Sequence, residues 1–383
     1  MNDAVRIGIV AGEASGDQLG AALIEALRAR SAHVECYGVA GPKMRAAGCE
    51  VWAPSDRLAM MGLAEVLTHL PALLRFRREL LGRFSARPPH VFVGIDAPEF
   101  NLGLELRLKR RGIRTVQYVS PQVWAWRQGR VRTMAAACDR VLCLLPFETR
   151  FYAAHAVSAA FVGHPLADRV PLAPDRAAAR ASLGIAPQAT VIALLPGSRI
   201  GEIEKLGADF AQAAARIATK RPEAVFVAPM ASSRGRETFE RVSAGSGAAI
   251  RLIDGCSHEV LAACDVALVA SGTATLETLL FKRPMVVAYR MSALTAFLLR
   301  RLGLVKVPYF AQPNLLLERR AVPEFFQEAV KPQTLSDAVL HWLEHPAQVA
   351  SLQSEFLHVH QMLQQGGADR AAGIILGLAN AGA

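Results

Sequence analysis

Short, almost uninterrupted apolar runs recur along the chain, with segments of helical character between them. Runs of this kind are typical of parallel strands that are buried on both faces of a sheet. In the first part of the chain they are VRIGIVAG, VECYGV, VFVGI, RTVQYV and RVLCLLP. The alternation predicts an α/β fold in which helices cover both faces of a parallel sheet.

A proline-rich stretch from His164 to Pro187 interrupts the alternation, which starts again with TVIALLP, AVFVAP, AIRLID, DVALVAS and PMVVAYR. We therefore predict two doubly wound, Rossmann-like domains, residues 1–168 and 169–346, that face a central cleft. Residues 347–383 are helical in composition. We expect this tail to cross back to the first domain or to a partner subunit, which leaves a homodimer open.

Composition narrows the class of partner. The formal charge of +10 favours an anionic partner: nucleic acid, a membrane surface or a phosphorylated substrate. Nucleic acid is disfavoured because no basic run is interleaved with stacking aromatics. Mean hydropathy is high at +0.24, but no window of about 18 apolar residues is free of charge, so we expect membrane contact without a spanning helix.

The six cysteines and the N-terminal residues indicate the compartment. No cysteine pair forms a C-x-x-C motif or lies near histidines at metal spacing, so we expect reduced thiols, no disulfide and no zinc. The sequence MNDAVRIGIVAG has no basic region, apolar core or cleavage site of a secretory signal. A cytoplasmic protein is expected.

Two segments, TVIALLPGSR and DVALVASGTATLE, share one design: an apolar strand, a turn of small residues and then a helix. Such a helix N-terminus directs free N–H groups at a ligand beyond the sheet and favours an anion. Arg199 offers a cation for a diphosphate beside the Gly272–Thr273 turn, and Glu277 an acceptor for a sugar diol. The alternatives are a solvated arginine and a surface glutamate. We predict a site for a nucleotide-diphosphate sugar.

Two turns of the first half carry candidate chemistry. Asp96, in GIDAPEFN, follows an apolar strand, where its carboxylate could act as a general base or could cap the helix near Pro98. Ser15, in GEASGD, opens the helix after the first strand and belongs to a ligand-binding turn or serves as an N-cap. The turn matches neither G-x-G-x-x-G nor a Walker loop.

Two further segments combine apolar surface with arginines. In VSPQVWAWRQGR, Trp124 could line a pocket beside Arg127 and Arg130, although tryptophan is more often core. The segment Leu58–Leu81 has helical apolar spacing, with Pro71 expected to kink or divide the helix. It suits a lipid-facing surface or a helix packed on its own core. The basic cluster at its far end is Arg75, Arg77 and Arg78.

At GEASGD, GIDAPEFN, VSPQVWAWR, LPGSR, SGTATLE and Pro313–Leu316, the chain resembles the lipid-A-disaccharide synthases, glycosyltransferases of the GT-B fold. The resemblance covers nearly the whole chain. It implies transfer of 2,3-diacylglucosamine from its UDP derivative to 2,3-diacylglucosamine 1-phosphate (lipid X), which gives a β(1→6)-linked disaccharide 1-phosphate and UDP. It also implies lipopolysaccharide synthesis by an enzyme that is peripheral on the cytoplasmic face of the inner membrane.

The resemblance also implies roles for particular residues. Asp96 would be the base for the 6-hydroxyl of the acceptor, Arg199 would neutralise the leaving diphosphate, and Glu277 would hold the ribose. We expect no metal or other cofactor, since the chain has no D-x-D pair and an arginine with a helix N-terminus can replace a divalent ion.

On the donor side, the resemblance gives Asn314 a role in binding, with Gln312 nearby. The family usually has serine-leucine-proline in that loop, whereas this chain has Ala311-Gln312-Pro313. Residues Arg75 to Arg78 would serve the acceptor phosphate or the lipid surface.

Two other classes of function stay open on the residues. One is another UDP-sugar enzyme of the same architecture, such as an epimerase or a muropeptide glycosyltransferase. That class would not explain the apolar face of the helical segment Leu58–Leu81. The other is a non-catalytic, nucleotide-binding peripheral membrane protein. A Rossmann dehydrogenase is disfavoured because neither half carries G-x-G-x-x-G.

Overall fold

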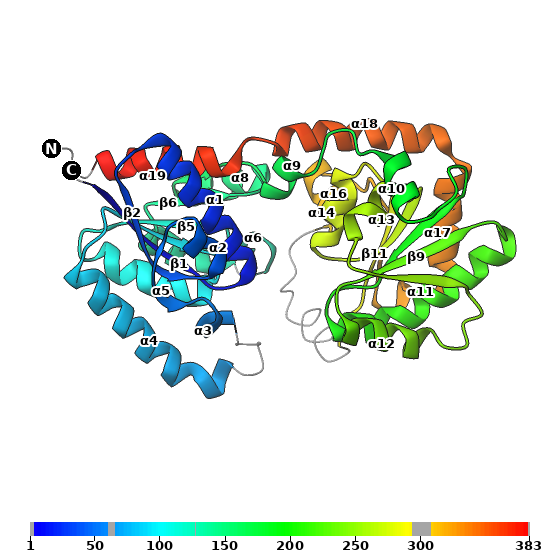
Figure 1. The fold of residues 1–383 in the computed structure, drawn as a ribbon, viewed down its shortest axis with the longest axis horizontal. Helices are drawn as coiled ribbons and strands as arrows, with labels where there is room; N and C mark the ends of the chain where they lie inside the picture. The colour runs from blue at the N-terminus through cyan, green and yellow to red at the C-terminus, as the bar shows by residue number, and fades with distance from the viewer. Residues whose placement is uncertain (1–3, 60–65, 127, 293–307, 382–383) are drawn as a thin grey trace. The chain divides into compact units, whose positions relative to one another are not determined.

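The computed structural model describes residues 4–59, 66–126, 128–292 and 308–381, and Figure 1 shows its course. The chain forms two compact units. The first comprises Met1–Asp168 and Leu363–Ala383, and the second Arg169–Met362. Both are built on a parallel sheet, so the predicted α/β fold with two Rossmann-like domains is confirmed.

The first unit contains a seven-stranded parallel sheet in the order β3-β2-β1-β4-β5-β6-β7. Its strands are β1 (Val5–Ala11), β2 (Val34–Ala40), β3 (Glu50–Pro54), β4 (Val91–Ile95), β5 (Arg114–Tyr118), β6 (Arg140–Cys143) and β7 (Ala159–Phe161). Its helices are α1 (Ala14–Arg30), α2 (Pro42–Ala46), α3 (Asp56–Ala59), α4 (Val66–Ala86), α5 (Pro98–Lys109), α6 (Val123–Trp126), η1 (Gln128–Arg130), α7 (Val131–Ala137), α8 (Pro146–Ala153), α9 (Pro165–Arg169) and α19 (Gly367–Asn380).

Side chains of the central strands point alternately into two hydrophobic cores, one on each face of the sheet. On β1, Ile7 and Ile9 face a core shared with α1 and α19, whereas Val10 faces a core shared with α4 and α5. This alternation is the two-residue period of a strand, and apolar residues from Ile7 to Ala11 allow the strand to be covered on both faces.

Helix α4 packs on the sheet through Phe76, Leu80 and Phe84. This packing agrees with the alternative that the segment is a helix packed on its own domain. Leu70, near the start of the helix, has 43% of its surface exposed to solvent. Pro71 was expected to kink or divide the helix, and since α4 continues through this residue, the division does not occur. Residues 60–65 of the predicted lipid-facing segment lie outside the described residues.

The second unit contains a six-stranded parallel sheet in the order β10-β9-β8-β11-β12-β13. Its strands are β8 (Val191–Leu195), β9 (Val225–Met230), β10 (Ile250–Asp254), β11 (Val266–Ala270), β12 (Met285–Tyr289) and β13 (Glu324–Phe326). Its helices are α10 (Arg176–Ser182), α11 (Ile200–Lys220), α12 (Ser233–Ser243), α13 (Ser257–Ala263), α14 (Thr273–Leu280), α16 (Gln312–Leu317), η2 (Gln327–Ala329), α17 (Pro332–Glu344) and α18 (Pro346–Leu363).

The C-terminal segment divides between the two units. Most of α18 belongs to the second unit, whereas α19 packs on α1 in the first unit. The carboxylate of Asp168 accepts hydrogen bonds from the N–H groups of Gly366 and Gly367, at 2.9 and 2.8 Å, and so fixes the start of α19. None of the described helices meets the length and apolarity needed to span a membrane.

Strand order places the ligand-binding edge of each sheet. The direction of winding reverses between β1 and β4 in the first unit, and between β8 and β11 in the second. Ligands of such sheets bind beyond the carboxyl ends of the strands at this reversal. The GEASGD turn follows β1 and the Asp96 turn follows β4, while the PGSR and SGT turns follow β8 and β11.

Candidate active-site pockets

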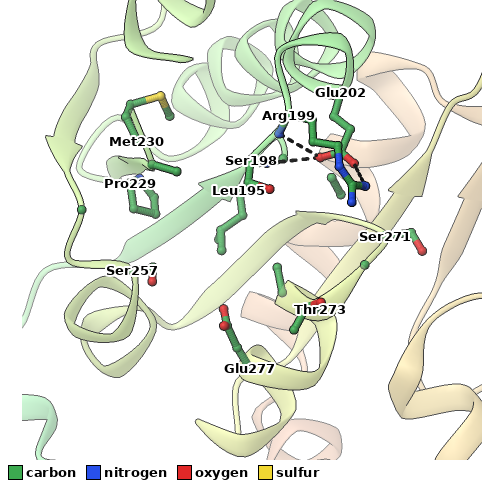
Figure 2. A pocket seen from close by; sticks show the side chains of 16 residues that line it. Leu195, Ser198, Arg199, Glu202, Pro229, Met230, Ser257, Ser271, Thr273 and Glu277 are labelled. Carbon is green, nitrogen blue, oxygen red and sulfur yellow. Dashed lines mark hydrogen bonds and ion pairs between the residues drawn. The ribbon is translucent and has the colours of Figure 1, made fainter. Parts of the chain in front are cut away.

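A cavity of about 380 Å³ opens at the carboxyl ends of β8 and β11 (Figure 2). Both turns that the sequence singled out contribute to it, so Arg199, Gly272, Thr273 and Glu277 come together. They meet because β8 and β11 are adjacent parallel strands whose following turns lie at one sheet edge. The side of the cavity next to β9 is formed by Pro229 and Met230.

The N-terminus of α14 provides donors at this cavity. Gly272 is its N-cap with φ 152°, a conformation that favours glycine. In the part of the chain that the structure describes, no acceptor is found for the N–H groups of Thr273 and Ala274. These donors and the helix dipole make this edge of the cavity suitable for a phosphate.

At the turn before α11 the sequence predicted free N–H donors, but the structure shows them occupied. The N–H groups of Ser198 and Arg199 donate to Oε2 of Glu202, at 3.2 and 3.3 Å, and Nη1 of Arg199 lies 3.3 Å from Oε1. Glu202 stands three residues after the N-cap, the spacing of a capping box, although the N-cap residue Arg199 is not the serine or threonine of the sequence signature. Its carboxylate therefore occupies the donors that an anion would need there.

Glu277 presents a carboxylate to the same cavity, toward which it points in Figure 2. Its carboxylate forms no hydrogen bond or ion pair with another described residue. A carboxylate in this state can accept hydrogen bonds from the hydroxyl groups of a ligand. The Arg199 side chain is 85% exposed, so it can turn toward the cavity without breaking core packing.

A second cavity, of about 350 Å³, lies in the first unit at the carboxyl ends of β4 and β5. It contains Asp96 together with Glu99, Ser120 and Arg130. Burial raises the pKa of Asp96, and the N–H of Ala97 opposes this rise. A carboxylate whose pKa moves toward the working pH is a better general base.

The predicted acceptor arginines lie elsewhere. Arg77 donates from Nη2 to the carbonyl oxygen of Glu99 at 2.9 Å and lies over the Phe100 ring at 5.1 Å. Burial, with Arg107 nearby, lowers its pKa. Arg77 therefore joins α4 to α5, while Arg75 and Arg78 are exposed on α4. None of the three lines the cavity with Asp96.

Trp124 lies in the interior and does not line the cavity. It is 8% exposed, Nε1 donates to Glu148 at 3.1 Å, and the ring packs edge-on against Phe147. Burial raises the pKa of Glu148 to about 7. Arg127 lies outside the described residues.

In the GEASGD turn, Ser15 is exposed in the first turn of α1, and Glu13 takes the N-cap position instead. Asp17 is the buried polar residue of this motif. It accepts hydrogen bonds from the N–H groups of Gly41, Lys43 and Met44, at 2.8 to 3.0 Å. Asp17 thus caps α2, a contact with a distant segment that the sequence did not signal.

Asn314 holds its own loop and does not line the cavity of the second unit. Nδ2 donates to the Val322 carbonyl and to Glu324 at 2.9 and 2.7 Å, and Oδ1 accepts from the N–H groups of Ala321 and Val322 at 2.7 and 2.9 Å. Gln312 donates from its backbone N–H to Thr275 Oγ1 at 3.3 Å. Neither side chain lines the described cavity of the second unit.

The described residues contain no group of three or more side chains suited to hold a metal ion.

Comparisons with known proteins agree with this geometry. The family model described as lipid-A-disaccharide synthetase matches residues 7–376. The chain is 51% identical to the lipid-A-disaccharide synthase of Pseudomonas aeruginosa over 380 residues, 99% of both chains. It is 50% identical to that of Yersinia pseudotuberculosis over 376 residues, 98% of this chain and 95% of the relative.

Among solved structures, the calicheamicin glycosyltransferase CalG4 superimposes with a TM-score of 0.62 at 16% identity, covering 100% of this chain and 99% of that one. At this identity the likeness concerns the fold, which is GT-B. Two similar sheets with a cavity at each carboxyl edge, and full-length relatives of one kind, lead to one assignment. The chain belongs to the lipid-A-disaccharide synthase family, glycosyltransferases of lipid A synthesis.

Proposed function

We propose that the chain condenses UDP-2,3-diacylglucosamine with 2,3-diacylglucosamine 1-phosphate to form a β(1→6)-linked disaccharide 1-phosphate and UDP. One observation carries this proposal: each unit holds a cavity at the carboxyl edge of its sheet, and the two cavities have complementary chemistry. One contains the half-buried carboxylate of Asp96, suited to activate a hydroxyl group. The other contains helix donors, a cation and the carboxylate of Glu277, for which the described residues offer no partner.

The second unit would bind the donor. The diphosphate would accept hydrogen bonds from the N–H groups of Thr273 and Ala274, while Glu277 accepts from the ribose hydroxyls. Arg199 would leave Glu202 and pair with the diphosphate as negative charge develops there. Donors that are already oriented toward the leaving group stabilise the transition state more than the ground state.

The first unit would bind the acceptor and activate it. As the 6-hydroxyl oxygen attacks the anomeric carbon, Asp96 takes its proton and the bond from that carbon to the diphosphate oxygen breaks. The electron pair of that bond leaves with UDP, and attack from the opposite face inverts the anomeric centre. Arg199 and the helix donors supply the charge stabilisation, so this scheme requires no metal ion.

Arg130 is our choice for the acceptor phosphate, because it lines the cavity that contains Asp96. The exposed residues Leu70, Arg75 and Arg78 of α4 would contact the membrane, with the arginines near anionic head groups. This surface would admit substrates whose acyl chains stay in the bilayer on the cytoplasmic face of the inner membrane.

Incubation of the purified protein with both substrates and a chelator tests the proposal by measuring released UDP and disaccharide. We expect Asp96→Asn to lose turnover while UDP binding stays intact, and Arg199→Ala to lose both. Consumption of the donor without acceptor would indicate an epimerase instead. Binding of UDP without any turnover would indicate a non-catalytic protein, and product formed only with magnesium would contradict the metal-free scheme.

A further inference from the structure

The turn that carries Asp96 has an unusual backbone. Asp96 and Ala97 follow β4 with φ angles of 53° and 41°, and Val119, which follows β5, has φ 76°. All three lie in the left-handed region, which residues other than glycine rarely adopt. Asp96 and Val119 both line the cavity of the first unit. Such strain persists only where neighbouring groups hold it, and it clusters at functional sites.

Two buried side-chain amides hold this turn. Nδ2 of Asn101, on α5, and Nε2 of Gln117, on β5, both donate to the carbonyl oxygen of Asp96, at 2.9 and 3.1 Å. Nε2 of Gln117 also reaches the carbonyl oxygen of Val119, at 3.2 Å. Both side chains are fully buried. Gln117 therefore ties together the two left-handed turns of the cavity.

Glu105 lies against the same group in the interior. A methyl group added to Gly94, two residues before Asp96, would fall 2.3 Å from Glu105 Oε1 and 2.8 Å from Asn101 Cβ, so these two side chains flank one point of β4. Oε2 of Glu105 accepts from Cys138 Sγ at 3.3 Å. Among the described residues, Oε1 of Glu105 and Oδ1 of Asn101 have no hydrogen-bond partner.

The protonation state of Glu105 follows from its surroundings. Burial raises its pKa to about 8, and only the weak hydrogen bond from Cys138 opposes this rise. A neutral carboxylic acid carries a proton that a carboxylate lacks, and here it avoids a buried negative charge without a cationic partner. Glutamine, which is neutral and of the same shape, would match this form of the side chain.

We propose that Asn101, Gln117 and Glu105 are positioning residues that fix the direction of the Asp96 carboxylate. The backbone N–H of Asp96 donates to Tyr118 at 2.9 Å, and its carbonyl oxygen is held by the two amides. Both peptide groups of Asp96 are thereby fixed, and with them the direction of the Cα–Cβ bond from which its carboxylate extends. This inference rests on the proposed role of Asp96 as the base.

Size-matched variants that remove the donors test the inference. Asn101→Leu and Gln117→Met are expected to lower kcat by about 100-fold, the order of loss for a misplaced catalytic group, and to leave both KM values and UDP affinity nearly unchanged. Glu105→Gln is expected to retain kcat, whereas Glu105→Ala loses it. The matched control is Thr115→Val. Thr115 lies on the same strand as Gln117, and its hydroxyl donates a buried hydrogen bond to the carbonyl oxygen of Ala137, which the variant removes. This variant should keep the kcat of wild type.

A double variant separates positioning from loss of fold. In an Asp96→Asn background, Asn101→Leu should cause no further loss of the residual rate, because the group that it positions is already disabled. If Asn101→Leu lowers the rate equally in both backgrounds, or if Thr115→Val is as damaging, the inference is overturned. A wild-type protein without turnover would overturn the proposed function and this inference with it, whereas active wild type with additive losses would overturn the inference alone.

Discussion

Arg130 donates from both terminal nitrogens to the two carboxylate oxygens of Glu99, at 2.5 and 2.8 Å, on the rim of the cavity that contains Asp96. A planar guanidinium matches carboxylate and phosphate oxygens equally well in this two-fold contact. Glu99 is 71% exposed in its side chain, so water can solvate its carboxylate when another anion displaces it. The pair thus resembles an anion site that one of the protein's own carboxylates fills.

The first prediction concerns recognition of the acceptor. Arg130→Ala should raise KM for the phosphorylated acceptor by about 10- to 100-fold, because a charge-assisted two-fold contact is lost. The variant should act on phosphorylated and dephosphorylated acceptors with similar efficiency, whereas wild type prefers the first. Steady-state kinetics with both acceptors measures this. Arg132→Ala, an exposed arginine on α7, is the control, and an undiminished preference in Arg130→Ala would place the phosphate elsewhere.

The second prediction concerns Glu202, which occupies the donors of the PGSR turn. Glu202→Ala should tighten UDP binding several-fold, because Arg199 and two N–H groups become available to the diphosphate. The same change should lower the free energy of unfolding by about 1 kcal/mol through loss of the helix cap. Titration calorimetry and urea unfolding report the two effects. Glu204→Ala, also on α11, is the control; weaker UDP binding in Glu202→Ala would mean that the cap shapes the donor site.

The third prediction concerns the pH dependence of stability. Lys282 is buried, and its Nζ lies 2.6 Å from Nδ1 of His360 and 3.3 Å from the carbonyl oxygen of Pro171. Burial, followed by the charge of Arg283, lowers the pKa of Lys282 to about 8 from an ordinary value of 10.5. Between these pH values the folded chain binds fewer protons than the unfolded chain, so this residue makes stability rise with pH there.

The Lys282→Met variant should lack that rise. Relative to wild type it should be more stable below about pH 8, by at most about 3 kcal/mol, and the difference should shrink toward pH 10.5. Urea unfolding of both proteins across this pH range measures the difference between their free energies of unfolding. The other titrating groups contribute equally to both proteins and cancel in this difference. Lys331→Met, at an exposed lysine, should run parallel to wild type. A constant difference across the range would show that Lys282 keeps its ordinary pKa.

The fourth prediction concerns the exposed arginines of α4. Reversal of charge at Arg75 and Arg78 should weaken binding to vesicles that contain phosphatidylglycerol by about 10-fold or more, since each basic residue near an anionic surface contributes about 1 kcal/mol. Vesicle co-sedimentation at low and high salt measures the loss. The control is the double variant Arg110→Glu and Arg111→Glu, at the end of α5, which has the same net charge as the α4 double variant. Equal loss in both double variants would mean that net charge, and not α4, governs binding.

The sequence predicted which residues lie at the carboxyl ends of strands better than it predicted which side chains contact one another. Arg199, Gly272 and Glu277 meet in one cavity, as expected, because each stands at a fixed distance from an apolar strand and the carboxyl ends of parallel strands share an edge. The position of Asp96 at a cavity beyond a strand end was predicted by the same reasoning. Its left-handed backbone and the amides of Asn101 and Gln117 were not, because they depend on segments that meet only in the folded chain.

Other residues were ambiguous by type. A tryptophan can line a pocket but is more often core, and Trp124 lies in the core, where its indole N–H donates to Glu148. Asn314 was expected at the donor, but its amide is used by a loop a few residues later, which no spacing rule reveals. The capping contact of Glu202 was not predicted, because the N-cap residue is Arg199 and not serine or threonine, and its competition with a ligand follows only from the cavity around it.

The anchoring of α19 by Asp168 has a consequence for synthesis of the protein. Ala371, Ala372 and Ile375 complete the core on one face of the first sheet, so that face stays uncovered until nearly the whole chain has left the ribosome. The second unit, whose residues are continuous from Arg169 to Met362, can close earlier. We therefore expect the amino-terminal body to mature last, and a nascent chain that stalls before residue 363 to expose an apolar surface that chaperones bind.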